Sequence, residues 1–333
     1  MHRRFAEREA AAPPIMTNFA KLAAHVRTEL SKVIVGQEDL VDQLLLVVAC
    51  GGHALLEGVP GLGKTLSAKS LARVCGLDFH RVQCTPDLMP ADVTGTNVFR
   101  LSDSTFQLHR GPVFTDVLLV DEINRTPPRT QSALLEAMEE RQVTIDGIRY
   151  QLPKNFTVLA TQNPIEFEGT YPLPEAQLDR FLFKIRVVYP THDEEAAILS
   201  RYETGFDARR WEEIPLNPAE SGLLEAARAE IELVRIEPTL LTYMVSVVGH
   251  TRDWPAIALG ASPRAAVGLL YVARALAAMD GRDYLLPDDV KAAAPPVLRH
   301  RVVLKPEAEM EGLQPDHVIA QIADTVEIPK RAT

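Results

Sequence analysis

The sequence that decides the fold of this chain is Gly58-Val59-Pro60-Gly61-Leu62-Gly63-Lys64-Thr65. It follows an apolar run, His53 to Glu57, that predicts a strand, and it opens a segment with helical spacing. The pattern G-x-x-x-x-G-K-[ST] in that context is typical of a phosphate-binding loop, because its glycines let backbone N–H groups turn toward a phosphate at a helix N-terminus. A glycine-rich turn without a ligand is the alternative. Lys64 disfavours it, because its charge opposes the helix dipole unless an anion binds there.

The polar side chains of this loop have expected roles in binding a nucleotide. Lys64 is placed to reach the β- and γ-phosphate oxygens, and the Thr65 hydroxyl is placed to ligate Mg²⁺. The nucleotide-binding residues predicted here are Gly58, Pro60, Gly61, Leu62, Gly63, Lys64, Thr65 and Leu66.

An acid pair ends a second apolar strand. Val117 to Val120 has the pattern of a buried strand, and Asp121 and Glu122 follow it directly. Because the carboxyl ends of parallel strands face the ligand crevice, we expect Asp121 to hold Mg²⁺ through water and Glu122 to polarise an attacking water. Acid pairs after strands are commonly only solvated, so this interpretation depends on the phosphate loop.

Three further polar residues are candidates for catalysis. Asn163 follows another apolar strand and is placed to orient the attacking water, although an Asn-Pro turn needs no such role. The rigid guanidinium fork of Arg180 suits the charge that develops in phosphoryl transfer, but a surface ion pair would explain this arginine equally well. Arg264 lies in the first turn of a helix that Ser262-Pro263 is expected to begin. Phosphate would offset its charge there, and a carboxylate from a neighbouring loop is the alternative.

The remaining pattern predicts an α/β domain followed by a helical one. Apolar runs alternate with helical segments, which indicates a mostly parallel sheet covered by helices. The predicted strands are His53 to Glu57, Phe79 to Gln83, Val117 to Asp121, Phe156 to Thr161 and Lys184 to Tyr189. After Pro190 the segments have helical spacing without strand alternation. We expect a flexible tail over 1–16, the α/β domain over 17–190 and an all-helical domain over 191–333.

Two hairpins are predicted inside the α/β domain. One pairs Val98 to Arg100 with Phe106 to Leu108, and the other pairs Val143 to Ile145 with Ile148 to Tyr150. The second contains Asp146-Gly147, a dipeptide that favours type I′ turns. Both hairpins are expected to project from the sheet as inserts.

Composition limits the function further. The 333 residues carry 45 Asp and Glu against 35 Lys and Arg, and this net charge of −10 works against a mainly electrostatic grip on nucleic acid or anionic lipid. Three cysteines without C-x-x-C spacing indicate neither a disulfide framework nor a thiolate zinc site, which fits a reducing cytoplasm. No apolar run approaches the ~20 residues that span a bilayer, so we expect no membrane insertion.

These residues together resemble the MoxR family of AAA+ ATPases, within the helix-2-insert clade. Long strings carry the resemblance, which covers nearly the whole chain after Met16. The strings are Val35-Gly36-Gln37, Asp121-Glu122-Ile123-Asn124-Arg125, Gln131 to Glu140, Ala160-Thr161-Gln162-Asn163-Pro164, Gly169 to Phe181 and Gly260 to Ala265.

The resemblance implies a fold and a set of roles. The sheet would have the order 5-1-4-3-2, and ATP would be held between it and a helical lid. Val35-Gly36-Gln37 would join the ATP-binding residues, Asn163 would be sensor 1 and Arg264 would be sensor 2. Such proteins assemble into rings, usually hexameric, so Arg180 would be an arginine finger supplied to a neighbour's ATP. The two hairpins would be the helix-2 and pre-sensor inserts.

The leading functional hypothesis is an ATP-hydrolysing ring chaperone that matures or activates a partner complex. Proteins similar to this one often act with a von Willebrand factor A domain protein. No D-x-S-x-S metal-site string occurs in this sequence, so that domain would come from another chain. The sequence does not indicate the client complex.

Three alternatives stand beside this hypothesis. The ATPase subunit of magnesium chelatase belongs to the same clade and uses ATP to drive metal insertion into a porphyrin. A nucleic-acid motor of the replicative-helicase type shares both inserts but needs cations at the hairpin tips, which here carry Ser102-Asp103-Ser104 and Asp146-Gly147. A nucleotide-gated scaffold with negligible turnover is disfavoured by Glu122.

Overall fold

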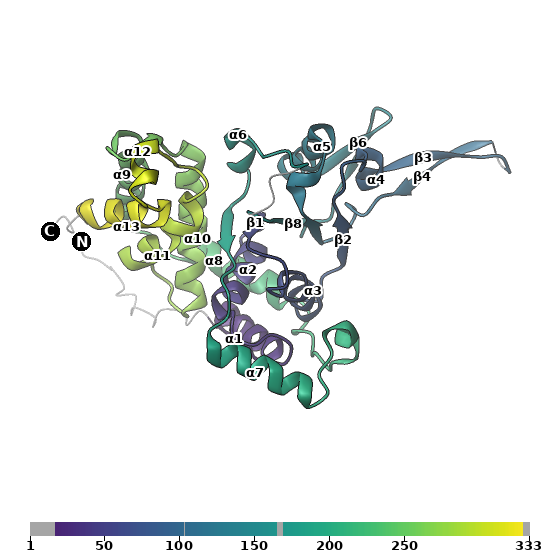
Figure 1. Cartoon of the computed structure of the whole chain (residues 1–333), viewed down its shortest axis with the longest axis horizontal. Helices are drawn as coiled ribbons and strands as arrows, with labels where there is room; N and C mark the ends of the chain where they lie inside the picture. Colours follow the sequence, from purple (N-terminus) through teal and green to yellow (C-terminus); the bar gives the residue numbers. More distant parts are fainter. Residues whose placement is uncertain (1–16, 103, 165–168, 329–333) are drawn as a thin grey trace, which may run out of the picture.

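A parallel sheet forms the centre of the α/β part of the protein (Figure 1). The computed structural model describes residues 17–102, 104–164 and 169–328, so the tail expected over 1–16 lies outside the described residues. Within them, the five-stranded sheet has the order β2-β5-β8-β1-β9, and every neighbouring pair is parallel. The strands are β1 (Ala54–Glu57), β2 (Phe79–Gln83), β5 (Val117–Asp121), β8 (Thr157–Gln162) and β9 (Phe183–Arg186). This is the expected order 5-1-4-3-2, read from the other edge.

Helices cover both faces of this sheet, which is why its strands read as continuous apolar runs. Leu56 and Leu119 belong to the core on one face, whereas Leu55 and Leu118 belong to the core on the other face. The helices on the first face are α1 (Asn18–Leu30), α2 (Glu38–Ala49) and α3 (Lys64–Val74), and those on the second are α4 (Pro90–Thr94) and α5 (Pro128–Glu140).

Both predicted hairpins are present and extend away from the sheet (Figure 1). The first is formed by β3 (Gly95–Arg100) and β4 (Thr105–Arg110), and the second by β6 (Gln142–Ile145) and β7 (Ile148–Gln151). The turn residues of the second, Asp146 and Gly147, have φ angles of 50° and 80°. Positive φ at both positions is what a type I′ turn requires, so that prediction is confirmed.

Among the described residues after β9 the chain is mostly helical, apart from an isolated bridge between Arg235 and Tyr284 and a ribbon that the sequence pattern did not predict. The helices are α7 (His192–Glu203), the short 3₁₀ segment η2 (Ala208–Glu213), α8 (Leu223–Leu233), α9 (Pro238–Asp253), α10 (Pro263–Met279), α11 (Pro287–Leu298), α12 (Pro306–Met310) and α13 (Pro315–Thr325). The ribbon is small and antiparallel and consists of β10 (Ile257–Leu259) and β11 (Val303–Leu304). Strands of three and two residues are too short to show alternation. None of the described helices is both long and apolar enough to cross a bilayer.

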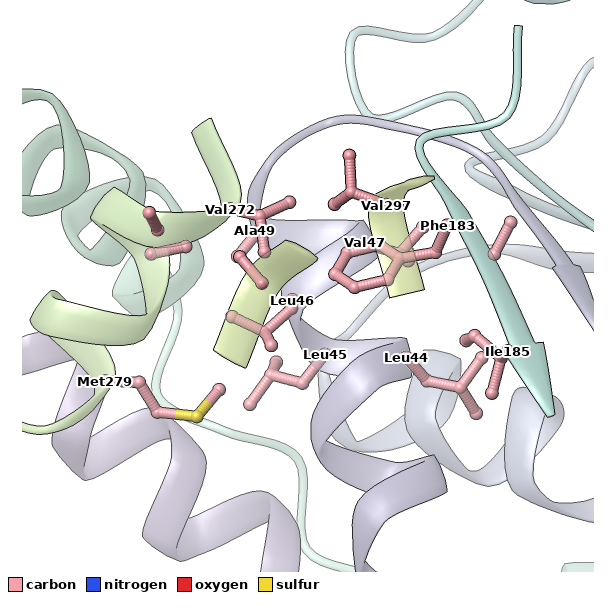
Figure 2. Packing of buried hydrophobic residues seen from close by; sticks show 14 of the residues in the cluster. Leu44, Leu45, Leu46, Val47, Ala49, Phe183, Ile185, Val272, Met279 and Val297 are labelled. Carbon is pink, nitrogen blue, oxygen red and sulfur yellow. The ribbon is translucent and has the colours of Figure 1, made fainter. Parts of the chain in front are cut away.

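Helix α2 joins the sheet to the helices that follow it (Figure 2). Its buried residues pack against strand β9 and helix α10, and helix α11 in turn contacts both α10 and β9. The labelled side chains in this contact are Leu44, Leu45, Leu46, Val47, Ala49, Phe183, Ile185, Val272, Met279 and Val297. Burying a large aliphatic side chain contributes roughly 1.5–3 kcal/mol relative to exposure, so this shared core holds α11 firmly against β9 and α10 against α2 and α11.

Candidate active site

A cavity of about 510 Å³ opens at the carboxyl ends of the central strands. Its size lies within the ~300–1,000 Å³ range of small-molecule sites. The sequence-predicted site residues that line it are Val35, Gln37, Pro60, Gly61, Leu62, Gly63, Lys64, Thr65, Leu66, Asp121, Glu122 and Asn163. Gly36, Gly58, Arg180 and Arg264 were also predicted but do not line it.

The phosphate loop turns tightly between β1 and α3. Gly61 and Gly63 have φ angles of 88° and 76°, a left-handed conformation that glycine adopts readily, and α3 begins at Lys64. The Lys64 ammonium donates to the carbonyl oxygens of Gly58 and Val59. Gly58 therefore contributes to the conformation of the loop through its backbone, although it does not line the cavity. Burial lowers the pKa of Lys64, and the charges of the nearby acid pair oppose that shift. An anion in the cavity would favour its charged form in the same way.

Asp121 is the most extensively bonded carboxylate of the cavity. Its Oδ1 accepts from the Thr161 hydroxyl at 3.0 Å, and its Oδ2 accepts from the Thr65 hydroxyl at 3.4 Å. Arg81 on β2 also places Nε 2.6 Å from Oδ2. A carboxylate and a hydroxyl side by side suit Mg²⁺, which prefers oxygen ligands and keeps several waters, so these residues fit the metal.

Glu122 is held in a strained and well-bonded conformation. Its φ angle is 59°, which places a non-glycine residue in the left-handed region between β5 and the 3₁₀ segment η1 (Ile123–Arg125). Its backbone N–H donates to the Thr161 hydroxyl at 2.9 Å. The carboxylate accepts from Gln83 Nε2 at 3.2 Å and pairs with Arg125 Nε at 3.1 Å. Strain of this kind costs about 1–3 kcal/mol and is concentrated at functional sites.

The Val35-Gly36-Gln37 segment lies at another side of the cavity and is tied to the chain that follows β9. Gln37 donates from Nε2 to the Val188 carbonyl at 2.9 Å. Gly36 has a φ angle of 66°, and a Cβ there would collide with the Glu194 carboxylate. The Glu194 side chain is flexible, so it is the left-handed backbone that favours glycine at position 36, whereas its two neighbours line the cavity.

Helix α7 and the residues after it form the wall that faces the phosphate loop. They contribute Ile198, Arg201, Tyr202, Phe206 and Ala208 to the cavity. Among the described residues that line it, none comes from α8 to α13. Of the helical part that the resemblance implies as a lid over ATP, only α7 and the segment directly after it adjoin this cavity among the described residues. The predicted domain boundary at 190 separates two parts that share this cavity, and it stays a prediction.

Arg180 and Arg264 lie together on a different face. Arg180 follows helix α6 (Glu175–Leu178), and its Nε is 3.6 Å from Glu139 Oε2. Arg264 reaches the same oxygen at 2.7 Å. Within one chain, each arginine thus pairs with the carboxylate of Glu139. An ion pair of this kind was the alternative to a catalytic role for both residues. The carboxylate comes from helix α5 and not from a loop.

Several cavity residues were not predicted from the sequence. They are Arg81 and Gln83 on β2, Thr161 on β8, Lys69 on α3, the five residues of α7 and the segment after it given above, and also Val33, Ile34 and Pro190. A signal for Arg81 and Gln83 existed, because alternate polar residues at the end of β2 point to one face and Gln83 pairs in register with Asp121. No local pattern marks Thr161, whose role arises from contact with both acids.

Comparison with known proteins agrees with this geometry. The sequence family described as the ATPase family associated with various cellular activities (AAA) matches residues 53–183, and the AAA lid domain matches residues 249–322. The chain is 45% identical to YeaC of Bacillus subtilis over 300 residues, covering 90% of this chain and 92% of that protein. It is 44% identical to chaperone MoxR1 of Mycobacterium tuberculosis over 326 residues, covering 93% and 84%.

A solved structure extends the agreement to the whole fold. The crystal structure of a Cytophaga hutchinsonii protein superposes with a TM-score of 0.85 at 42% identity, covering 95% of this chain and 97% of that one. Both relatives and this structure match along nearly the full described chain, well beyond the phosphate loop. The chain therefore belongs to the MoxR family of AAA+ ATPases, and its activity is the hydrolysis of ATP.

Proposed function

We propose that the protein is a ring-forming chaperone that uses ATP hydrolysis to mature or activate a partner protein complex in the cytoplasm. The observation that supports ring assembly is that the nucleotide-binding residues and the two candidate catalytic arginines lie apart within one chain. The phosphate loop and the acid pair line one cavity, whereas Arg180 and Arg264 share Glu139 elsewhere on the chain. A second copy is the natural source of the missing arginines.

The cavity residues have distinct roles in this proposal. Lys64 binds the β- and γ-phosphates, and Thr65 and Asp121 hold Mg²⁺, which supplies charge neutralisation of the phosphate oxygens when bound. Glu122 polarises the attacking water, and Asn163 orients it. Asn163 is buried at the end of β8 and lines the same cavity as Glu122, which supports this assignment.

The arginines act on the nucleotide of the adjoining subunit. Arg180 is the finger whose guanidinium stabilises the developing charge, and Arg264 accompanies it because both side chains bind one carboxylate. Their side chains are 35% and 47% exposed, so a neighbouring phosphate can reach them. Glu139 keeps the two cations together until phosphate replaces it. A hexamer is the stoichiometry we propose.

A protein client fits the surface better than a nucleic acid. The β3–β4 hairpin, which extends from the body in Figure 1, exposes large apolar side chains. Those exposed by 46% or more are Val98, Phe99, Leu101 and Phe106. Apolar patches of this kind mark protein contacts, whereas a nucleic-acid hairpin needs cations. A von Willebrand factor A domain protein is the partner we propose, and the relative named as a chaperone supports the activity.

Calorimetric titration with ATP and Mg²⁺ tests the site. Wild-type protein should release heat on ATP addition, and Lys64→Ala should lose that binding because the phosphates lose their main cation. Lys21→Ala, an exposed lysine on α1, is the matched control and should bind like wild type. Absence of heat with folded wild-type protein would remove the proposal altogether.

The client and ring require separate measurements. Light scattering with ATP should give the mass of a closed ring, and a monomer at all nucleotide concentrations would contradict the trans site. Affinity capture with Glu122→Gln and ATP should recover the client together with a von Willebrand factor A domain protein. Coupling of ATP turnover to porphyrin metallation would favour the chelatase alternative instead.

A further inference from the structure

A buried arginine from the C-terminal helical part grips the chain segment that carries Arg180. Arg301 lies between α11 and β11, and its side chain is only 3% exposed. Its guanidinium reaches across to residues 179–182, which join α6 to β9. The two positions are far apart in sequence, so this contact links the helical part to the sheet.

The contacts surround Arg180 without touching its side chain. Arg301 Nε is 2.7 Å from Asp179 Oδ1, and NH2 donates to the Asp179 carbonyl at 3.0 Å and to the Phe181 carbonyl at 2.7 Å. NH1 donates to the Leu182 carbonyl at 3.3 Å. The backbone is therefore bonded to one guanidinium on both sides of Arg180.

Two neighbours of Arg301 strengthen this grip. The Ser262 hydroxyl, at the start of α10, donates to Asp179 Oδ2 at 2.9 Å. His300 Nε2 lies 2.9 Å from the Phe181 carbonyl oxygen, and burial holds the pKa of His300 well below its usual range. A neutral imidazole donates there without adding a second charge beside Arg301.

The physical character of this contact makes it rigid. Burial lowers the pKa of Arg301, while the bond to Asp179 opposes the shift. A buried guanidinium needs its partners, because breaking a buried pair leaves an uncompensated charge that costs several kcal/mol. The planar fork also fixes the directions of its donors. NH1 of Arg301 also donates to the carbonyl oxygen of Val297, whose side chain belongs to the shared core of α2, β9, α10 and α11 in Figure 2.

We propose that Arg301 is a positioning residue for Arg180. It fixes the 179–182 segment so that the Arg180 side chain points toward the ATP of the adjoining subunit. The position of the helices α10 and α11 then controls hydrolysis at that neighbouring site. This inference rests on the proposed role of Arg180 as a finger acting in trans.

A double-mutant cycle tests the proposal through ATP turnover and nucleotide affinity. Arg301→Gln should lower kcat by about 10²-fold, which is the cost of misplacing a catalytic group by ~1 Å, and leave the Kd for ATP unchanged. The double variant Arg301→Gln, Arg180→Ala should have the kcat of Arg180→Ala alone, because Arg301 then has no Arg180 side chain to position.

Arg299→Gln is the matched control. Arg299 lies two residues earlier and is largely covered, with a side chain 12% exposed and bonds to Asp316 and to the Lys184 carbonyl. None of its hydrogen bonds found among the described residues reaches the 179–182 segment. Loss of docking between helices and sheet would therefore affect both variants, whereas loss of positioning affects only Arg301→Gln.

Mixed rings give a readout that a purely structural role would not change. Glu122→Gln subunits retain Arg180, so adding them to Arg301→Gln subunits should restore part of the turnover. Restoration together with the non-additive cycle supports the proposal. Equal turnover in Arg301→Gln and Arg299→Gln, or a slow Arg301→Gln that mixing does not rescue, overturns the role of Arg301 while the proposed function stands.

Two outcomes separate the remaining cases. Normal turnover by Arg180→Ala would remove the finger and overturn both proposals. If Arg301→Gln does not fold by circular dichroism, Arg301→Lys replaces it, because lysine keeps the buried charge but lacks the fork. Arg301→Lys should still be slow and rescued in mixed rings, and a wild-type kcat for it would overturn the proposal.

Discussion

The cavity and the arginine face are built in opposite ways. In the cavity, Lys64 begins α3 after the loop that follows β1, whereas Asp121 and Glu122 lie at the end of β5, and all three converge on one space. On the arginine face, Arg180 and Arg264 come from two unconnected elements and converge on one carboxylate, that of Glu139. The first region has Lys64, Lys69, Arg81 and Arg201 around it but neither of the two arginines with predicted catalytic roles, and the second region has those two arginines without a phosphate loop.

This difference indicates how the activity depends on assembly. Sheet register fixes the cavity inside a single chain, so nucleotide binding should need only one copy. Hydrolysis should need two, because in this chain the arginines that complete the charge stabilisation lie outside the cavity. Binding and turnover should therefore separate when the arginine face is altered.

Removal of the finger should give the largest such separation. Arg180→Ala is expected to bind ATP with wild-type affinity and to lose about 10³–10⁵ in kcat, or roughly 4–7 kcal/mol. Turnover assays and calorimetry on the same preparation measure both quantities. If the affinity for ATP fell together with kcat, Arg180 would act in the cavity of its own chain, and the division between a binding cavity and a separate arginine face would be wrong.

Mixing two inactive variants should recover an intermediate part of that activity. Glu122→Gln lacks the base but keeps the finger, and Arg180→Ala has the opposite defect. Rings that contain both should include some complete sites, so the mixture should turn over ATP faster than either variant alone. A rate that stays at the mean of the two parents across all mixing ratios would argue for sites that one chain completes.

A change inside the cavity should have a smaller effect and should not be rescued by mixing with Glu122→Gln subunits, whose own cavity is defective. The Thr161 hydroxyl donates to Asp121 and accepts from the Glu122 N–H, so Thr161→Val leaves both acids less well held. Hydrogen bonds to charged groups contribute about 1.5–3 kcal/mol, which corresponds to a kcat loss of roughly 10- to 100-fold. Thr157→Val, earlier on the same strand and bonded only locally through its hydroxyl, should keep wild-type kcat.

Local patterns predicted the strands of the cavity well. The bounds of β2 and β5 are those expected from the sequence, and the others differ by no more than a few residues. Their apolar runs are buried on both faces, so the pattern is strong and continuous. The β10–β11 ribbon was missed because each strand is only three residues or fewer.

The sequence by itself determined the phosphate loop, the acid pair after β5 and the family, because each depends on residues that are neighbours along the chain. Only the tertiary structure decided that Arg81 pairs with Asp121, that Glu139 holds both arginines and that Arg301 grips Asp179. The last pair is separated by 122 residues. Such contacts are set by how strands pair and how helices pack on the sheet: strand alternation places Arg81 on one face without naming its partner, and arginines in loops or helix starts carry no periodic signal at all.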